Sequence, residues 1–373
     1  MNILNIDFLE RCAYDCLKEK WKRKDVIQYF AETMRLDVNV VKEIITTGDR
    51  HELARIAAYR MQQELAAKQL HLTPIWYREK IDASSQKARR IGIQNIDQQL
   101  YDYVAVYAME DMMCRIGEYQ CASIPGRGPI WGMRHIRKWL KNPHVKYSAQ
   151  LDIHKCFPSI PQDRLLSMID KYVANADVRW LVRQLVETFE QGLSIGSYLS
   201  QYLCNLYISQ LYHKVSENMY YTRRGKRIRL VEHVLIYMDD ILLLGRNAKA
   251  MNKAVRQVIK YAHDVLGLQI KPDWSVKQIG KKDFIDIMGF RIYRKRVTIR
   301  RRVFLRIRRA YKNVLKRSNH SPTLRQAQKC VSYLGIAQNT IAVKFAKKYK
   351  VYETAKRSKE VISHESKLRC RAA

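Results

Sequence analysis

Hydrophobic residues in the first 75 positions recur at the three- and four-residue spacing of helices. Residues 26–34 carry one such series, and residues 53–61 carry another within a longer predicted helix. Residues 38–45 form a shorter helix candidate, with Asp37 as its N-cap and an end near Gly48. No residues of evident chemistry stand out in this region. Ordinary helical packing is therefore the simpler interpretation, and a small docking module is the alternative.

Basic segments and helical patterns alternate between residues 76 and 145. A helix is predicted over residues 97–116. A turn rich in glycine and proline follows at residues 123–129, and it opens into a basic amphipathic helix predicted over residues 132–140.

Strand patterns alternate with helix patterns over residues 146–292, which predicts a small sheet backed by helices on one face. The predicted elements are a strand over 147–153, helices over 163–173, 178–189, 197–212 and 249–266, and hairpins over 234–244 and 284–300.

Two adjacent acids mark the tip of the first hairpin, in the sequence Tyr237-Met238-Asp239-Asp240. Apolar runs at 234–236 and 241–244 flank the tip, as expected for two strands joined by a tight turn. Like charges side by side in apolar surroundings are costly unless something neutralises them. A divalent metal ion, which prefers hard oxygen ligands, is the simplest neutraliser, and a polar hairpin turn is the alternative.

Composition adds a large positive charge to this picture. The chain has 373 residues with 69 Lys+Arg against 35 Asp+Glu, and its formal charge is +34. A folded chain with this charge is expected to bind a polyanion, with nucleic acid favoured over a membrane surface. The sequence predicts no transmembrane span and no signal peptide. The eight cysteines lack zinc spacing and are interpreted as reduced thiols of a cytoplasmic protein.

The positive charge is concentrated near the end of the chain. Residues 291–373 contain 25 Lys+Arg and 3 Asp+Glu, so they contribute 25 − 3 = +22. One-signed charge with interleaved aromatics favours a surface that grips a nucleic-acid duplex, because a merely solvated helical face usually mixes both signs. The candidate basic residues at the start of this region are Arg300, Arg301, Arg302, Arg308 and Arg309.

A third acid, Asp152, lies at the end of the strand predicted over residues 147–153. Alone it would be interpreted as a cap or turn residue. Together with Asp239 and Asp240 it would give three carboxylates on two adjacent strands, with the backbone carbonyl of Ile153 as a further ligand. Such a set can hold two Mg²⁺ ions about 4 Å apart for in-line phosphoryl transfer. Mn²⁺ is the natural substitute.

Five motifs follow one another along the chain: Pro125-Gly126-Arg127-Gly128, Asp152 with Phe157-Pro158-Ser159-Ile160, residues 192–201, Tyr237-Met238-Asp239-Asp240, and Met288-Gly289-Phe290. In this order and spacing they resemble the motifs of a reverse transcriptase of the bacterial, non-retroviral kind. The resemblance spans residues 76–345.

The resemblance implies an α+β, right-hand polymerase fold of fingers, palm and helical thumb with an N-terminal helical extension. It places the extension at residues 1–75, the fingers at 76–145, the palm with part of the fingers at 146–292, and the basic helical thumb and C-terminal tail at 293–373.

The resemblance also implies nucleotide-binding roles. Phe157 would be a steric gate that excludes a 2′-hydroxyl and so selects dNTPs, and a core Phe is the alternative. Arg89, assisted by Lys87 or Lys80, would contact the triphosphate, because the guanidinium fork binds phosphate bidentately. Lys271 is a candidate proton donor to the departing pyrophosphate.

Further roles follow from the remaining motifs. Gly196 and Gln201 belong to the helix motif that supports template and nucleotide. Arg127 is a candidate nucleic-acid contact. Met288, Gly289 and Phe290 would form the primer grip, although Gly289 fits an ordinary strand bulge as well.

One departure distinguishes the chain from many relatives. Ser194-Ile195-Gly196 and Ser200-Gln201 stand where those have Pro-Gln-Gly-x-x-x-Ser-Pro, so the chain resembles defence-associated and diversity-generating-retroelement enzymes. Losing a Gln beside the nucleotide removes a polar anchor and bears on copying fidelity. No RNase H, maturase or zinc-bearing endonuclease region is expected after the thumb.

The sequence thus predicts an RNA-directed DNA polymerase that copies a dedicated noncoding RNA in bacterial or prophage-encoded anti-phage defence. The expected partners are the RNA template, the DNA product and dNTPs, with no membrane, and protein partners or an oligomer stay open. A diversity-generating-retroelement or group II-like reverse transcriptase is the alternative. A non-catalytic RNA-binding scaffold is the alternative of another class.

Overall fold

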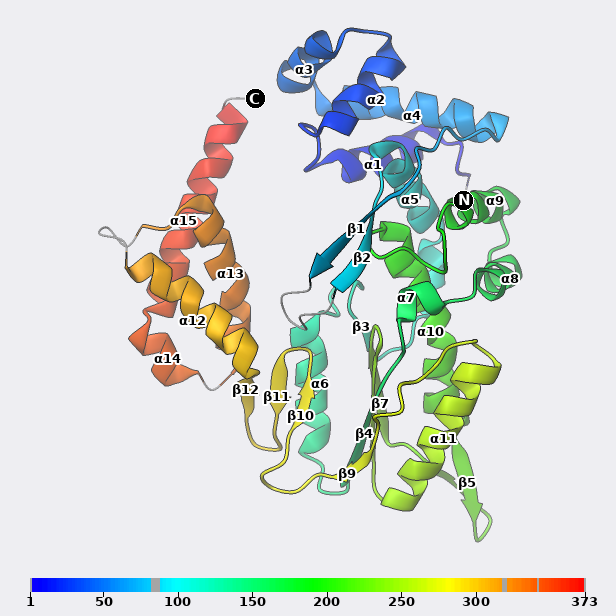
Figure 1. The fold of residues 1–373 in the computed structure, drawn as a ribbon, viewed down its shortest axis with the longest axis vertical. Helices are drawn as coiled ribbons and strands as arrows, with labels where there is room; N and C mark the ends of the chain where they lie inside the picture. The colour runs from blue at the N-terminus through cyan, green and yellow to red at the C-terminus, as the bar shows by residue number, and fades with distance from the viewer. Residues whose placement is uncertain (1, 82–87, 317–320, 341, 372–373) are drawn as a thin grey trace. The chain divides into compact units, whose positions relative to one another are not determined.

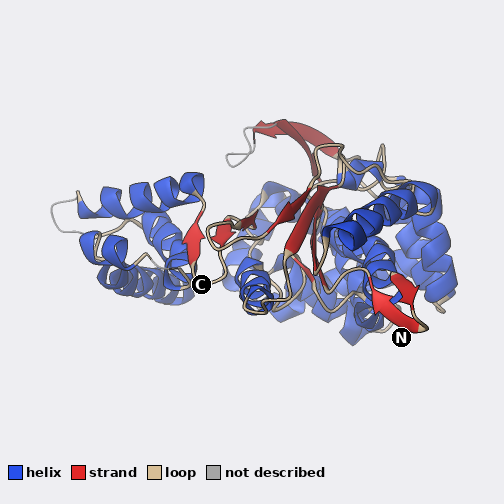
Figure 2. Ribbon diagram, turned by 90° about the horizontal axis from the view of Figure 1, so that it is seen from below, coloured by secondary structure: helices blue, strands red, loops and turns tan. Residues whose placement is uncertain are grey.

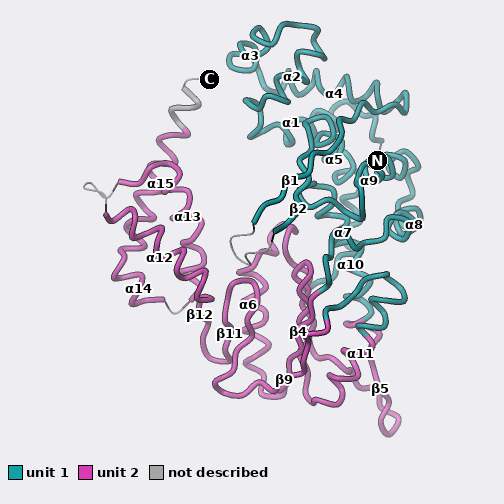
Figure 3. The backbone as a smooth tube through the Cα atoms, viewed as in Figure 1, with its two compact units in different colours: residues 1–118, 153–214, 258–271 teal, residues 119–152, 215–257, 272–373 magenta. Residues whose placement is uncertain are grey.

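The computed structural model describes residues 2–81, 88–316, 321–340 and 342–371. The chain forms two compact units, each built from segments that are far apart in the sequence (Figure 3). Unit 1 comprises Met1–Glu118, Ile153–Lys214 and Val258–Lys271, and unit 2 comprises Tyr119–Asp152, Val215–Gln257 and Pro272–Ala373. The boundaries predicted for extension, fingers, palm and thumb stay predictions.

Unit 1 is mainly helical (Figure 1). Its elements are α1 (Ile6–Leu17), α2 (Lys24–Met34), α3 (Val38–Thr47), α4 (Arg50–Ala67), β1 (Trp76–Ile81), β2 (Ala88–Ile93), α5 (Ile96–Ala108), the 3₁₀ helix η1 (Glu110–Arg115), α7 (Cys156–Ser159), α8 (Gln162–Tyr172) and α9 (Ala176–Glu187). Helix α10 (Tyr198–Asn218) begins in unit 1 and ends in unit 2, whereas α11 (Ala248–Asp264) begins in unit 2 and ends in unit 1.

The four N-terminal helices confirm the helical pattern predicted for the first 75 residues. The Asp37 side chain accepts a 2.7 Å hydrogen bond from the Asn39 N–H, so it caps α3 as predicted. Helix α3 then ends at Thr47, directly before Gly48. Asn5 and Asp49 cap α1 and α4 in the same manner, because each side chain accepts a backbone N–H of the first turn.

Two predictions for unit 1 were wrong or incomplete. The helix predicted over residues 97–116 ends as α5 at Ala108, and η1 follows it. The antiparallel β1–β2 pair, in which Trp76 lies opposite Ile93, was not predicted. Most side chains of both strands are exposed, so they lack the apolar alternation by which a half-buried strand is identified.

Backbone hydrogen bonds join four segments of unit 1 that carry predicted site residues. The Gly92 N–H donates to the Ile195 carbonyl at 2.8 Å, and the Leu193 N–H donates to the Phe157 carbonyl at 2.9 Å. The His154 N–H donates to the Gln269 carbonyl at 2.8 Å, beside a bridge between residues 153 and 270. Strand β2, helix α7, the loop before α10 and the segment after α11 therefore form one backbone framework.

Glycines allow these segments to approach one another. At Gly192, where φ is +54°, an added Cβ would lie 2.5 Å from the Pro158 carbonyl oxygen. A Cβ at Gly92 would lie 2.0 Å from Ser194 Oγ, and one at Gly196, where φ is +118°, would lie 2.5 Å from the Gly92 oxygen. Side chains at these positions would push the framework apart.

A buried carboxylate fixes the start of α10. Asp102 of α5 is fully buried and accepts a 2.8 Å hydrogen bond from the Ser197 hydroxyl and a 3.4 Å hydrogen bond from the Leu199 N–H. A carboxylate suits this position because the N-terminus of a helix carries partial positive charge. Burial nevertheless raises the pKa of Asp102 to about 6, because desolvation penalises the ionised form.

Unit 2 contains a five-stranded sheet, two small sheets and helices. Its elements are β3 (Gln120–Cys121), α6 (Pro129–Leu140), β4 (Tyr147–Asp152), β5 (Tyr220–Arg223), β6 (Lys226–Arg229), β7 (His233–Tyr237), β8 (Asp240–Gly245), β9 (Val276–Gln278), β10 (Ile285–Ile287), β11 (Phe290–Ile292), β12 (Val297–Ile299), α12 (Arg301–Leu315), α13 (Leu324–Gln338), α14 (Val343–Lys348) and α15 (Val351–Arg371).

The five-stranded sheet has the order β3-β7-β8-β4-β9, with β3 parallel to β7 and the other neighbours antiparallel. The predicted strand at 147–153 and the predicted hairpin at 234–244 are confirmed as β4 and β7–β8. Every residue from Ile241 to Leu244 is buried, so both faces of the sheet are covered. The prediction that helices back only one face was therefore wrong.

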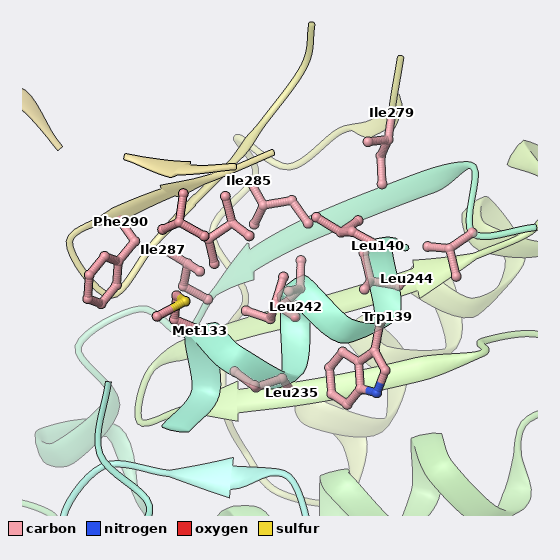
Figure 4. Close-up of a cluster of buried hydrophobic side chains, with 14 of the residues drawn as sticks. Met133, Trp139, Leu140, Leu235, Leu242, Leu244, Ile279, Ile285, Ile287 and Phe290 are labelled. Carbon is pink, nitrogen blue, oxygen red and sulfur yellow. The ribbon is translucent and has the colours of Figure 1, made fainter. Parts of the chain in front are cut away.

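One face of this sheet carries a cluster of buried side chains (Figure 4). Met133, Trp139 and Leu140 of α6 lie against Leu235 and Leu242 of the β7–β8 pair. The β10–β12 sheet adds Ile285, Ile287 and Phe290 to the same cluster. Full burial of each such side chain contributes about 1.5–3 kcal/mol, so the cluster gives the sheet a rigid support.

The second predicted hairpin, over residues 284–300, is instead a three-stranded antiparallel sheet of β10, β11 and β12. The turn between β10 and β11 consists of Met288 and Gly289, both with positive φ. Gly289 is therefore a turn residue, and the alternative of a strand bulge was wrong. The basic helix predicted from residue 132 begins three residues earlier, with Pro129 in its first turn.

After β12 the described residues form the helices α12–α15 and the short loops beside them (Figure 2). Helices α12–α15 share a core in which Tyr311 donates a 2.7 Å hydrogen bond to the Cys330 carbonyl. Among the described residues, no helix is both long and apolar enough to cross a bilayer. The cysteines whose side chains are described are free, as predicted; they are Cys12, Cys16, Cys114, Cys121, Cys156, Cys204 and Cys330.

The framework of unit 1 depends on residue 192 being a glycine, because there is no room for a side chain there. Gly192→Ala should destabilise the protein by more than about 3 kcal/mol. The alanine backbone would have to keep a left-handed conformation, and its methyl group would clash with the Pro158 backbone. The matched control is Gly225→Ala, which also has positive φ (+73°) but open space around it, and it should cost only about 1–2 kcal/mol. Equal unfolding midpoints for the two variants in urea would contradict the clash.

The buried carboxylate should make stability depend on pH. Because the folded chain binds the Asp102 proton more tightly than the unfolded chain does, its stabilising contribution is complete below about pH 4 and is lost as pH rises to about 6. Asp102→Asn should therefore gain about 3 kcal/mol relative to wild type between pH 4 and pH 7. Urea unfolding of both proteins across this range measures the difference, and a constant difference would refute the pKa shift.

Candidate active site

The two adjacent acids lie at the turn between β7 and β8, but they differ in position. The turn consists of Met238 and Asp239, whereas Asp240 is the first residue of β8. The sequence predicted that both acids form the hairpin tip. The turn in fact lies one residue earlier, so only Asp239 belongs to it. Met238 has φ +53°, which is uncommon for a residue with a side chain, and such backbone strain is concentrated at functional sites.

Asp152 lies directly opposite Asp240 in the antiparallel pairing of β4 with β8. Opposed residues in such a pair have Cβ atoms about 4.5–5.5 Å apart, and like charges there are destabilising. Asp239 precedes Asp240 in the chain, so the backbone gathers all three acids at one end of the sheet. This register confirms the prediction that the three acids lie on two adjacent strands, whereas their role as metal ligands stays a prediction.

Tyr237 lies opposite Asp240 on the other side, in the β7–β8 pairing. Burial raises the pKa of its hydroxyl, and the Asp240 and Asp239 carboxylates raise it further. The tyrosine therefore stays protonated at neutral pH and presents a neutral side chain beside the acids.

The donor set fits a divalent cation, although the side chains do not enclose one. Three carboxylates are the hard oxygen ligands that Mg²⁺ prefers. Among the described residues, no group of three or more His, Cys, Asp or Glu side chains forms a ready metal site. The fit therefore rests on the backbone register. Without a cation the carboxylates repel one another, so their side chains are not expected to converge.

The predicted nucleotide-binding residues lie on the framework of unit 1. Arg89 is exposed on β2, opposite Lys80 of β1. Its neighbour Arg90 already has partners within the chain. It donates hydrogen bonds of 2.7 and 3.0 Å to Glu190 and lies over the ring of Tyr77. Lys87 lies outside the described residues.

The other predicted nucleotide-binding residues stand on neighbouring segments. Phe157 is half-buried in α7, and its carbonyl accepts the Leu193 N–H. Gly196 lies in the loop against β2, and Gln201 is half-buried in the first turn of α10. Lys271 directly follows the segment bonded to residues 153 and 154. The framework thus brings together the segments of Arg89, Phe157, Gly196 and Lys271. Asp102, which anchors α10, was missed.

The primer-grip motif is mostly part of the core. Phe290 is 1% exposed and packs in the cluster of Figure 4, so its ring supports the sheet. Met288 lies over α6, where an added Cβ at Gly132 would be 2.8 Å from its sulfur. The turn backbone at residues 288–289 is therefore the part of the motif that could meet a primer.

The predicted basic contacts divide into two kinds. Arg300 is paired, since its Nε lies 2.6 Å from an oxygen of Asp286. Arg127 lies in the tight loop before α6, with its guanidinium 5.9 Å from the centre of the Trp131 ring. The remaining four are exposed on α12, as a nucleic-acid-binding face requires; they are Arg301, Arg302, Arg308 and Arg309.

Comparison with known proteins gives a family match. The family model for reverse transcriptase (RNA-dependent DNA polymerase) matches residues 79–337, more than half of the chain. Two matching solved structures are of apo telomerase from Candida tropicalis. The one truncated from the C-terminal domain is 14% identical, with a TM-score of 0.42, and covers 61% of this chain. The other is 12% identical, with a TM-score of 0.45, and covers 79% of this chain.

The chain covers 54% and 64% of those two structures, which is less than two thirds of either. No curated protein matches. The predicted α+β polymerase fold is confirmed by the family match together with the mixed helices and sheets of the structure. The chain belongs to the reverse transcriptase (RNA-dependent DNA polymerase) family.

Proposed function

We propose that this chain is an RNA-directed DNA polymerase that copies a dedicated noncoding RNA by two-metal nucleotidyl transfer. The observation that carries the proposal is the register that sets Asp152 opposite Asp240, beside the turn that holds Asp239. A scaffold without activity would have no reason to keep two like charges opposed on paired strands. The family match supports the same reaction class.

Asp152, Asp239 and Asp240 would hold the divalent ions, with the Ile153 carbonyl as an additional oxygen ligand. Bound Mg²⁺ ions supply charge neutralisation at the attacking 3′-hydroxyl and at the leaving pyrophosphate. The protein contributes positioning, because β4 and β8 are held by a buried sheet whose apolar residues cannot shift without opening the core.

The framework of unit 1 would bind the incoming nucleotide. Arg89 would bind the triphosphate, and Lys271 would return a proton to the pyrophosphate. Phe157 holds its ring under the sugar, where bulk excludes a 2′-hydroxyl. This assignment is supported by the backbone bonds that tie β2, α7 and the segment before Lys271 into one framework.

We further propose a role in anti-phage defence, in the cytoplasm of a bacterium, with a cognate noncoding RNA as template. The support is the form of two motifs, Pro125-Gly126-Arg127-Gly128-Pro129 and Phe157-Pro158-Ser159-Ile160, which resemble those of defence-associated groups. Ser194-Ile195-Gly196 and Ser200-Gln201 fit the defence-associated and the diversity-generating groups alike. Errors concentrated at template adenines would decide for the diversity-generating alternative.

Removal of the two acids at the turn should abolish polymerisation. Asp239→Ala combined with Asp240→Ala should lower primer extension on an RNA template by about 10³-fold or more, because metal ligation supplies several kcal/mol. RNA binding measured in the same preparation should persist. The matched control, Glu353→Ala with Glu360→Ala on the exposed face of α15, removes equal charge and should extend primers normally. Primer extension by the Asp239/Asp240 variant would refute the assignment of these two residues as metal ligands.

Sugar selection tests the placement of Phe157. Phe157→Ala should reduce the preference for dNTPs over rNTPs by about 10–200-fold, the range expected when a pocket loses steric exclusion. Phe157→Tyr keeps the bulk of the ring and should retain the preference. Single-nucleotide incorporation with each substrate gives the ratio of kcat/KM values. An unchanged ratio in Phe157→Ala would assign the ring to packing alone.

A further inference from the structure

A basic β-hairpin in unit 2 has no part in the site described above. Within the described part of the chain, strands β5 and β6 pair only with each other, as a two-stranded sheet. The turn residues Arg224 and Gly225 both have positive φ, as the tightest hairpin turn requires. The hairpin carries five basic residues and no acid; they are Arg223, Arg224, Lys226, Arg227 and Arg229.

All five basic side chains are exposed. None of them makes an ion pair with any residue in the described part of the chain. The acid that follows the hairpin, Glu232, is engaged with Arg246 at 2.8 Å. Arg227 lies 4.0 Å from the centre of the Tyr220 ring, so cationic and aromatic groups share one surface of the hairpin.

The register of β5 with β6 brings the positive charges of the hairpin close together. Arg223 lies directly opposite Lys226, although like charges at such positions are destabilising. Isolated two-stranded hairpins are marginally stable, so this arrangement is poorly explained by stability. A bound polyanion would reverse the sign of the effect, because each cation would then face a phosphate.

The hairpin is rooted at the end of β7 that lies away from the catalytic turn. The Leu230 N–H donates a 3.0 Å hydrogen bond to the Met219 carbonyl, and both side chains are buried, which anchors the base. Strand β7 then runs from His233 to Tyr237 before the acids, and its five residues alone span roughly 15 Å between the hairpin and the turn at about 3.3 Å per residue. In Figure 1 the β5 hairpin projects beyond the rest of unit 2 at that end.

We propose that the β5–β6 hairpin is a second nucleic-acid contact, which grips the phosphodiester backbone of an RNA segment outside the template–primer duplex. Arginine suits this task because its fork binds phosphate bidentately, and Tyr220 and Tyr221 offer rings on which unpaired bases can stack. The hairpin would thereby hold the template RNA while the catalytic turn works elsewhere along it. The choice of RNA rests on the proposed function, whereas the choice of a polyanion rests on the hairpin alone.

The test compares two full-length variants of equal charge. The first changes Arg223, Arg224, Lys226 and Arg227 to Gln. The second changes four exposed basic residues of α11 to Gln, namely Lys249, Lys253, Arg256 and Lys260. Binding is measured in the absence of Mg²⁺ to a short RNA–DNA duplex and to the same duplex continued by a stem-loop RNA. Continuations in DNA and competition by polyglutamate complete the set.

The hairpin variant should bind the RNA-continued substrate about ten-fold or more weakly, and the slope of log affinity against log salt should fall by about 3. Its affinity for the short duplex should not change, and the α11 variant should resemble wild type on both. A third variant with Lys at positions 223, 224 and 227 keeps the charge and should restore binding, which separates charge from folding.

Equal losses in the hairpin and α11 variants would overturn the proposal in favour of net charge. No loss in either variant would overturn it outright. Equal binding of a DNA continuation would keep the phosphate contact but remove its assignment to RNA, and effective competition by polyglutamate would point to an acidic protein instead. Because binding is measured without Mg²⁺, a wild type that extends no primer would refute the proposed function and leave this result intact.

Discussion

The opposition of Asp152 and Asp240 across two paired strands is the constraint on which the candidate site depends. Two carboxylates there repel each other, and the strands remain paired because their apolar residues are buried on both faces. Burial of Leu151, Ile241 and Leu242 offsets the repulsion several times over. A rigid sheet thus holds charges in a costly arrangement, which the proposed divalent cations would make favourable.

The framework of unit 1 is held together differently. It depends on close approach of backbone segments rather than on buried side chains. Gly92, Gly192 and Gly196 leave room for three chain segments to hydrogen bond, and Asp102 fixes the helix that follows them. The carboxylate at Asp102 is costly when ionised, so the anchoring of α10 is obtained at the expense of stability at neutral pH.

The sequence predicted those features whose physical signal is local. The apolar runs around Asp239 marked the hairpin, and Asp37 marked a helix start, because turn and cap chemistry act over a few residues. The break after Ala108 was hidden because Met109, Met112 and Ile116 remain buried at helical spacing across it. Asp102 was missed because a polar residue within a helix pattern looks like solvent-exposed surface. Phe290 resembled a functional aromatic, yet only tertiary packing shows that it is core.

Charge is distributed in a way that separates the roles of the regions. Residues 1–75 contain 12 Lys+Arg and 11 Asp+Glu, so they contribute 12 − 11 = +1 of the total charge of +34. The α1–α4 helices therefore have no electrostatic reason to bind nucleic acid, whereas α12 and the β5–β6 hairpin do. Solubility alone would favour mixed signs on every surface. Arg223 and Lys226 stand opposite each other without an acid between them, and a bound polyanion would make that arrangement favourable.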